Sequence, residues 1–203
     1  MNYQTSFMYN ESMDNRRIGY LEVIAGPMYC GKTEELIRQV KRAAIGKKNI
    51  RVFKHQIDTR YGFDKKLFSH AGLSFESEMV GNACQILDMV DNKTQIVAID
   101  EAQWFGEKLI DVIDILLNRG KHVIVAGLAM TFNRQPFTPV PTLMAMADKV
   151  TKLSAICSIC GEEAVYHKRI SKGKTVDPHK ADPSLVGKIK NYQARCRRCY
   201  KKP

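Results

Sequence analysis

The sequence predicts an α/β protein in which a mostly parallel sheet with helices is followed by a small zinc-binding segment. Three observations support this fold class. Strand-like apolar runs alternate with helix-like patterns between residues 19 and 150. A glycine-rich loop of the form G-x-x-x-x-G-K-[ST] lies between the first strand and the first helix, and two C-x₂-C pairs lie after residue 150. A chain of 203 residues is long enough for one such domain with a small appendage.

Each element is predicted from the periodicity of its apolar residues. Tyr20 to Ala25 is a short β-rich run, and after Lys32 apolar residues recur at helical spacing until Gly46. The helix predicted at 106–119 has one apolar face and is followed by a glycine, which is common just after helix ends. The other predicted elements are strands at 49–54, 95–100 and 122–126 and helices at 82–90 and 141–149, the last with Pro141 in its first turn.

These patterns divide the chain into three parts. Residues 1–18 have no periodicity and are interpreted as a flexible arm, residues 19–150 as the α/β domain and residues 151–203 as the zinc-binding domain. The formal net charge of +11 is concentrated in the last part. Residues 1–150 hold 19 basic and 17 acidic side chains, whereas residues 151–203 hold 13 and 4. A surface that binds polyanions over the whole protein is therefore not favoured.

Composition excludes several classes of protein. With 44% hydrophobic and 26% charged residues the chain lies in the globular range, which disfavours disorder, collagen and disulfide miniproteins. No apolar run reaches the length of a membrane span, and the first 17 residues are polar where a signal peptide needs an apolar stretch. We therefore expect a cytoplasmic protein with no membrane partner. In that reducing compartment, paired cysteines indicate a metal before they indicate disulfides.

The loop between the first strand and the first helix predicts a phosphate-binding site. Its glycines allow backbone N–H groups to surround phosphates, and the helix N-terminus adds its positive dipole. Lys32 is expected to reach the outer phosphates, and the Thr33 hydroxyl to join the shell of a Mg²⁺ ion. The thiol of Cys30 is expected to pack rather than react. The predicted nucleotide-binding residues of this loop are Gly26, Pro27, Met28, Tyr29, Cys30, Gly31, Lys32 and Thr33.

Two consecutive carboxylates lie at the end of the strand predicted at 95–100 and directly after it. Asp100 follows a buried apolar run, as a second Mg²⁺ ligand does in nucleotide-binding domains of this kind. Glu101 comes next, one residue past the metal ligand. It is placed to take a proton from a hydroxyl that accepts a phosphoryl group, or to polarise a water molecule as in an ATPase. The spacing alone leaves both roles open.

The four late cysteines predict a structural zinc site. Cys157, Cys160, Cys196 and Cys199 form two C-x₂-C pairs separated by 35 residues, and four thiolates complete a tetrahedral Zn²⁺ shell with no position left for catalysis. The metal would close the long intervening loop. Zinc ribbons with basic residues also bind nucleic acid, so a nucleic-acid-binding NTPase stays open, as does a nucleotide-binding module without turnover. Aromatic stacking platforms are sparse in this segment, which disfavours the nucleic-acid alternative.

The joint pattern resembles the thymidine kinases of the cytosolic, zinc-containing type. The resemblance runs from about Tyr20 to Tyr200, nearly the whole chain, and its segments follow the order of that family. They are Gly26-Pro27-Met28 in the loop, Asp58-Thr59-Arg60-Tyr61, Ser69-His70, Asp100-Glu101-Ala102-Gln103, the run from Phe132 to Phe137, the run from Thr151 to Cys157, and Tyr192 ahead of Arg195-Cys196-Arg197-Arg198-Cys199.

The resemblance implies a RecA-like P-loop domain, a small zinc domain with a lasso loop, and assembly as a homotetramer. It also implies transfer of the γ-phosphate of ATP to the 5′-hydroxyl of thymidine, and usually of deoxyuridine, in nucleotide salvage. Thymidine triphosphate is the feedback inhibitor that the family leads us to expect. The implied partners are thus thymidine, ATP and further copies of the chain, and neither nucleic acid nor a membrane.

The resemblance also assigns roles to individual residues. Glu101 matches the catalytic base of the family, which favours a kinase over an ATPase. ATP and its Mg²⁺ are assigned the phosphate loop, Asp100, Gln103 and the segment Asp58, Thr59 and Arg60. For the nucleoside the family uses an apolar pocket and backbone groups of the lasso. The matching positions are Met28, Trp104, Leu128, Phe132, Phe137 and Tyr192, with Pro183, Ser184, Leu185, Val186 and Gly187 as the lasso segment.

The sequence departs from the family at three places. Ala129 stands where the family commonly has Asp after Gly127-Leu128, so the function of that carboxylate is absent or supplied by another group. Trp104 replaces the commoner Phe and is expected to narrow the pocket near the base. The segment from Thr175 to Ser184 is long and lacks the usual paired glycines.

Overall fold

The computed structural model describes residues 18–57, 66–68, 72–171, 174–175 and 191–201. Its centre is a six-stranded sheet in the order β5-β2-β6-β7-β1-β8, in which every neighbouring pair is parallel. This confirms the predicted α/β class with a mostly parallel sheet. The strands are β1 (Tyr20–Ala25), β2 (Ile50–His55), β5 (Glu78–Val80), β6 (Ile96–Asp100), β7 (His122–Gly127) and β8 (Lys149–Lys152).

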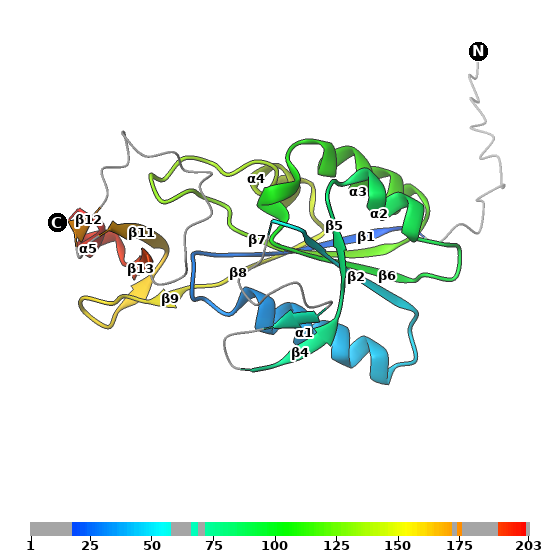
Figure 1. The fold of residues 1–203 in the computed structure, drawn as a ribbon, viewed down its shortest axis with the longest axis horizontal. Coiled ribbons are helices and arrows are strands. Elements are labelled where there is room, and N and C mark those ends of the chain that lie inside the picture. Colours follow the sequence, from blue (N-terminus) through cyan, green and yellow to red (C-terminus); the bar gives the residue numbers. More distant parts are fainter. Residues whose placement is uncertain (1–17, 58–65, 69–71, 172–173, 176–190, 202–203) are drawn as a thin grey trace, which may run out of the picture.

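Helices cover both faces of the sheet (Figure 1). α1 (Lys32–Ile45) and the hairpin of β3 (Lys66–Phe68) and β4 (Ser74–Glu76) lie on one face, and α2 (Cys84–Met89), α3 (Lys108–Asn118) and α4 (Val140–Met146) lie on the other. Successive strand residues point to opposite faces. In β1, Leu21 and Val23 therefore pack with α3, whereas Ile24 packs with α1. Burial on both faces explains why the strands are continuous apolar runs.

The predicted helix at 141–149 is wrong at its end. α4 stops at Met146, and the next residues form β8, which runs parallel to β1 at the edge of the sheet. Ala147 is extended, and the carboxylate of Asp148 accepts the backbone N–H of Leu21 at 2.7 Å. That contact directs the chain along β1, a tertiary effect that periodicity does not contain. β8 also crosses residue 150, where the sequence suggests a domain boundary.

The part of the chain that carries the four late cysteines follows β8 directly and is called the zinc-binding segment (residues 153–203). Its elements are β9 (Ala155–Ile156), β10 (Glu163–Ala164), β11 (Tyr166–Ser171), β12 (Lys174–Thr175), β13 (Tyr192–Arg195) and α5 (Arg197–Tyr200). β9 pairs with β10, and β11 pairs with both β12 and β13, all antiparallel. The segment lies beyond one end of the central sheet (Figure 1). Within the ranges that the structure describes, no helix has the length and apolar character needed to cross a membrane.

The topology brings three loops to one edge of the sheet. β6, β7 and β1 are neighbours and parallel, so their carboxyl ends meet at the same edge. Residues 26–31 follow β1, and residues 128–139 follow β7. Glu101 and the short 3₁₀ helix η1 (Ala102–Phe105) follow β6. Ligands of open parallel sheets bind at such an edge.

Candidate active site

The phosphate loop joins β1 to α1 and has a conformation that requires glycine. Gly31 precedes the helix with φ of 81°, in the left-handed region that suits a residue without Cβ. A Cβ on Gly26 would lie 2.5 Å from Cys30 Sγ and 2.7 Å from the Leu153 carbonyl oxygen. The Cys30 side chain also packs against the cysteine cluster of the zinc-binding segment. The loop is thus wedged between the central sheet and that segment.

A hydroxyl at the start of α1 contacts the carboxylate that ends β6, and the neighbouring lysine contacts the loop. The Lys32 ammonium is buried and donates to the Pro27 carbonyl at 2.7 Å, so it lies over the loop. Thr33 Oγ1 donates to Asp100 Oδ2 at 2.9 Å. A hydroxyl and a carboxylate oxygen side by side are the hard ligands that Mg²⁺ prefers. The Thr33–Asp100 pair therefore fits a magnesium ion, and the Lys32 ammonium over the loop fits a phosphate.

Glu101 occupies a strained and buried position next to Asp100. Its φ of 52° is left-handed, which is costly for a residue with a side chain and is found most often at functional sites. Its N–H donates to Asp100 Oδ1 at 2.9 Å. Gln103 donates its amide to Glu101 Oε2, while its carbonyl oxygen accepts the N–H of Leu128 at 2.9 Å. Gln103 thus fixes the direction of the Glu101 carboxylate against the end of β7.

Two pairs of aromatic side chains involve the loop that follows β7. Residues 129–137 form a hairpin-like loop whose ends are joined by the Phe137 N–H and the Ala129 carbonyl at 3.0 Å. At its base, Phe137 meets Trp104 edge to face, with ring centroids 5.4 Å apart. Near its tip, the buried Phe132 faces Tyr192 of β13 at 6.4 Å. The Tyr29 hydroxyl donates to the Tyr192 carbonyl at 3.0 Å, which links the phosphate loop to β13.

His167, which no sequence pattern singles out, lies beside Tyr192. It lies in β11, is 4% exposed, and meets the Tyr192 ring edge to face at 5.8 Å. With Gly26 and Pro27 of the phosphate loop it borders a small cavity between the loop and the zinc-binding segment. Burial, helped by the nearby Lys32 charge, lowers the pKa of His167 to about 3. Its imidazole is therefore neutral at physiological pH.

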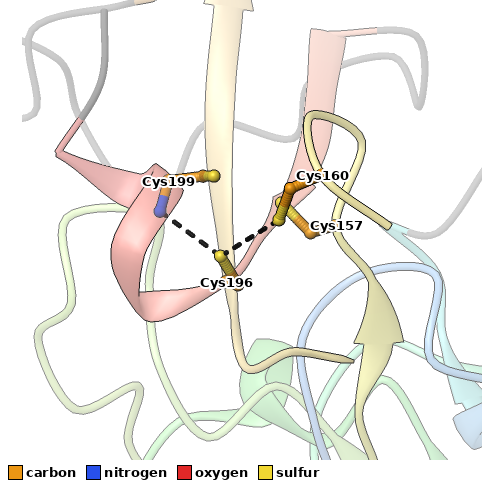
Figure 2. Close-up of side chains that lie close together, drawn as sticks. All are labelled: Cys157, Cys160, Cys196 and Cys199. Atoms are coloured by element: carbon orange, nitrogen blue, oxygen red, sulfur yellow. Dashed lines mark hydrogen bonds between the residues drawn. The ribbon is translucent and has the colours of Figure 1, made fainter. Parts of the chain in front are cut away.

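The four late cysteines converge as predicted. Their Sγ atoms lie within 4.8 Å of one another (Figure 2), and all six cysteines of the chain are free. Cys160 Sγ and Cys196 Sγ are 3.6 Å apart, near the separation of about 3.8 Å that Zn–S bonds of 2.3 Å give in a tetrahedron. Burial alone raises the pKa of Cys157, but N–H groups from Cys196, Ile159 and Cys160 outweigh it and lower that pKa to about 6. The donor set fits structural zinc.

Comparison with known proteins agrees with this geometry. The family model described as thymidine kinase matches residues 19–200, most of the chain. The chain belongs to the thymidine kinase family. As a member of this family, the protein is a nucleoside kinase, a transferase that uses ATP and phosphorylates thymidine. The family match and the cysteine cluster together support a nucleotide-binding α/β domain with a metal-stabilised segment.

Most of the site residues predicted from the sequence lie in the described part of the chain. Loop residues 26–33, Asp100, Glu101 and Gln103 lie together at the carboxyl edge of the sheet, with Met28 half-buried in the loop. Trp104, Phe137, Phe132 and Tyr192 form two ring pairs, and Leu128 is bound to Gln103. Outside the described residues lie Asp58, Thr59 and Arg60 of the expected donor region and Pro183, Ser184, Leu185, Val186 and Gly187 of the expected lasso.

Two residues that contact the predicted site positions, His167 and Tyr200, could not be predicted from the sequence. His167 follows Tyr166 in a basic strand, and a single histidine there carries no spacing signal. Tyr200 directly follows the last cysteine, and its hydroxyl donates to the Phe132 carbonyl at 2.6 Å. The position next to a metal ligand was the available signal for Tyr200, but its partner is 68 residues away and appears only in the fold.

Proposed function

We propose that the protein transfers the γ-phosphate of ATP to the 5′-hydroxyl of thymidine, and also of deoxyuridine, with Glu101 as the base. The observation that carries this proposal is the chain of contacts from Thr33 through Asp100 to Glu101 and Gln103. It puts a fixed carboxylate directly beside the phosphate loop. A base at this position can take the proton of a hydroxyl while the hydroxyl oxygen attacks phosphorus.

The transfer step follows from these positions. Lys32 and the loop N–H groups hold the phosphates, and Thr33 and Asp100 would hold Mg²⁺, whose charge offsets that of the phosphate oxygens. The 5′-oxygen forms a bond to the γ-phosphorus as the bond from that phosphorus to the ADP oxygen breaks. The hydroxyl proton passes to the Glu101 carboxylate. The products are ADP and the nucleoside monophosphate.

The nucleoside is proposed to lie beside the two aromatic ring pairs. Phe132 and Tyr192 offer one wall, Trp104 and Phe137 a second, and Met28 and Leu128 complete the apolar lining. Aromatic and apolar side chains with a few fixed polar groups are typical of pockets for small molecules. The Asp58 to Arg60 segment is proposed to contact ATP, and the Pro183 to Gly187 segment the base.

Several wider properties are proposed on the strength of family membership. These are a role in nucleotide salvage, a cytoplasmic location, assembly as a homotetramer and inhibition by thymidine triphosphate. Zinc bound by the four cysteines is proposed to be structural, since four thiolates leave no open coordination position.

One assay tests the proposed reaction. The protein is incubated with γ-labelled ATP and Mg²⁺, and with thymidine, deoxyuridine, deoxycytidine or single-stranded DNA in separate reactions. We expect labelled monophosphate from thymidine and deoxyuridine and little from deoxycytidine. Release of free phosphate that DNA stimulates, without any labelled nucleotide, would support a nucleic-acid-dependent NTPase instead. Adding thymidine triphosphate to the thymidine reaction tests the proposed inhibition.

A further inference from the structure

The tip of the 129–137 loop is held by the last helix of the chain. Tyr200 of α5 donates its hydroxyl proton to the Phe132 carbonyl at 2.6 Å, in a buried contact between residues 68 positions apart. Tyr200 is 7% exposed and Phe132 is 2% exposed. A hydrogen bond shielded from water in this way is costly to break, because the carbonyl that loses its donor stays buried.

The cysteine cluster fixes the position of Tyr200. α5 is a single turn capped by Cys196, the residue before it, whose Sγ accepts the N–H of Cys199 at 3.3 Å (Figure 2). The Tyr200 N–H donates to the Cys196 carbonyl at 2.9 Å. Cys196 and Cys199, two of the four clustered cysteines, therefore position the backbone of Tyr200. The Tyr200 side chain extends from there to Phe132.

A second contact holds the same loop tip. Arg134, at the loop tip, has a left-handed φ of 64°. Its guanidinium lies 4.8 Å from the ring centroid of Tyr200 and 5.9 Å from that of Tyr166, within the range of cation–π attraction. Phe132 thus has Tyr200 on its carbonyl and the Arg134 contact two residues later.

We propose that Tyr200 is a positioning residue for the nucleoside pocket. Its hydroxyl holds the Phe132 backbone, so that the Phe132 ring keeps its place against Tyr192. The assignment rests on the proposed placement of the nucleoside beside these two rings. Lys32, Thr33 and Asp100 make none of these contacts in the described part of the chain. Loss of the Tyr200 hydroxyl is therefore expected to weaken thymidine binding and to leave ATP binding unchanged.

Tyr200→Phe tests this role, because it removes the hydroxyl and keeps the ring. Trp104 is the single tryptophan of the chain, so its fluorescence reports thymidine binding without ATP. We expect the Kd and KM for thymidine to rise about 3- to 10-fold, as for one lost hydrogen bond. The KM for ATP and the zinc content should stay at wild-type values. Tyr166→Phe is the matched control, since that ring lies in the same cluster and the described residues offer its hydroxyl no hydrogen bond.

Three results would overturn the assignment. One is an unchanged Kd for thymidine in Tyr200→Phe. A second is a parallel rise of the KM values for thymidine and ATP, or loss of zinc, because the hydroxyl would then support the whole segment rather than Phe132. The third is an equal effect of Tyr166→Phe. Failure of the wild-type protein to phosphorylate thymidine would instead contradict the proposed function, so the two failures are distinguishable.

Discussion

At the scale of single residues, hydrogen bonds, backbone conformation and burial fix the orientation or the charge of the side chains at the candidate site. The hydrogen bond from Gln103 and the left-handed backbone of Glu101 orient the Glu101 carboxylate. Burial lowers the pKa of His167 and keeps its imidazole neutral. The sequence could predict Glu101, because its distance from the end of a strand is fixed by the motif. It could not predict His167, because burial and the nearby Lys32 charge arise only when β11 packs against the phosphate loop.

The depressed pKa of His167 predicts a pH dependence of stability. An unfolded chain protonates this histidine near its ordinary value of about 6.5, whereas the native pKa is about 3. Between these values the unfolded state binds one more proton, so the free energy of unfolding falls as pH drops from 6.5. The slope from this group is at most about 1.4 kcal/mol per pH unit. His167→Gln should remove that share of the slope.

Urea unfolding at pH 7, 6, 5 and 4 measures the difference between the two proteins. Loss of zinc in acid affects both proteins alike, so the comparison of slopes isolates His167. Parallel curves for wild type and His167→Gln over this range would show that the histidine is already protonated in the native state or that it is exposed.

At the scale of elements, strands and helices with strong periodicity could be predicted, and short edge elements could not. β1, α1, β6, α3 and β7 lie within two residues of their expected bounds. β5 has three residues and β8 has four, too few for a period to show, and both are placed by pairing with longer neighbours. The cysteine spacing indicated the metal site. It could not indicate that Tyr192 and Tyr200 of the zinc-binding segment contact Phe132.

The phosphate loop makes an element-scale prediction. Gly26→Ala places a Cβ 2.5 Å from Cys30 Sγ and 2.7 Å from the Leu153 carbonyl, so the loop has to move. Displacing a positioning loop by a fraction of an ångström is expected to lower kcat/KM for ATP by about 10- to 100-fold. Steady-state kinetics with varied ATP provides the measurement.

Gly46→Ala at the other end of α1 is the control for this substitution. Gly46 has an ordinary φ of −74°, and its Cβ would lie 3.3 Å from the nearest atom, the Ala43 carbonyl oxygen. Its kinetics for ATP should match those of wild type. A Gly26→Ala variant with wild-type kinetics would mean that the loop is not wedged against Cys30 and Leu153 as described.

At the scale of the whole molecule, the net charge of +11 belongs mainly to the zinc-binding segment. The cysteine cluster joins this segment to the catalytic edge through Cys30 on one side and through Tyr200 and Phe132 on the other. We expect metal binding to affect the proposed nucleoside pocket, reached through Tyr200 and Phe132, more than the phosphate loop, which is also held by β1 and α1 on either side.

Loss of zinc is predicted to raise the KM for thymidine much more than the KM for ATP. Cys157→Ser should lose the metal and raise the KM for thymidine more than about tenfold, with a change in the KM for ATP of less than about threefold. Zinc content by atomic absorption and KM values for both substrates measure this. Cys84→Ser, at an exposed cysteine outside the cluster, is the control. Equal loss of both affinities would indicate global unfolding and contradict a local role of the metal.

Single-turnover kinetics of Glu101→Gln tests whether Glu101 takes the proton of the nucleoside hydroxyl. The substitution keeps the shape of the side chain and an oxygen that can accept from Gln103, but removes the basic carboxylate. We predict a fall of about 10²- to 10⁴-fold in the rate of phosphoryl transfer, with the Kd for thymidine from Trp104 fluorescence unchanged. A wild-type rate of monophosphate formation in Glu101→Gln would contradict the account.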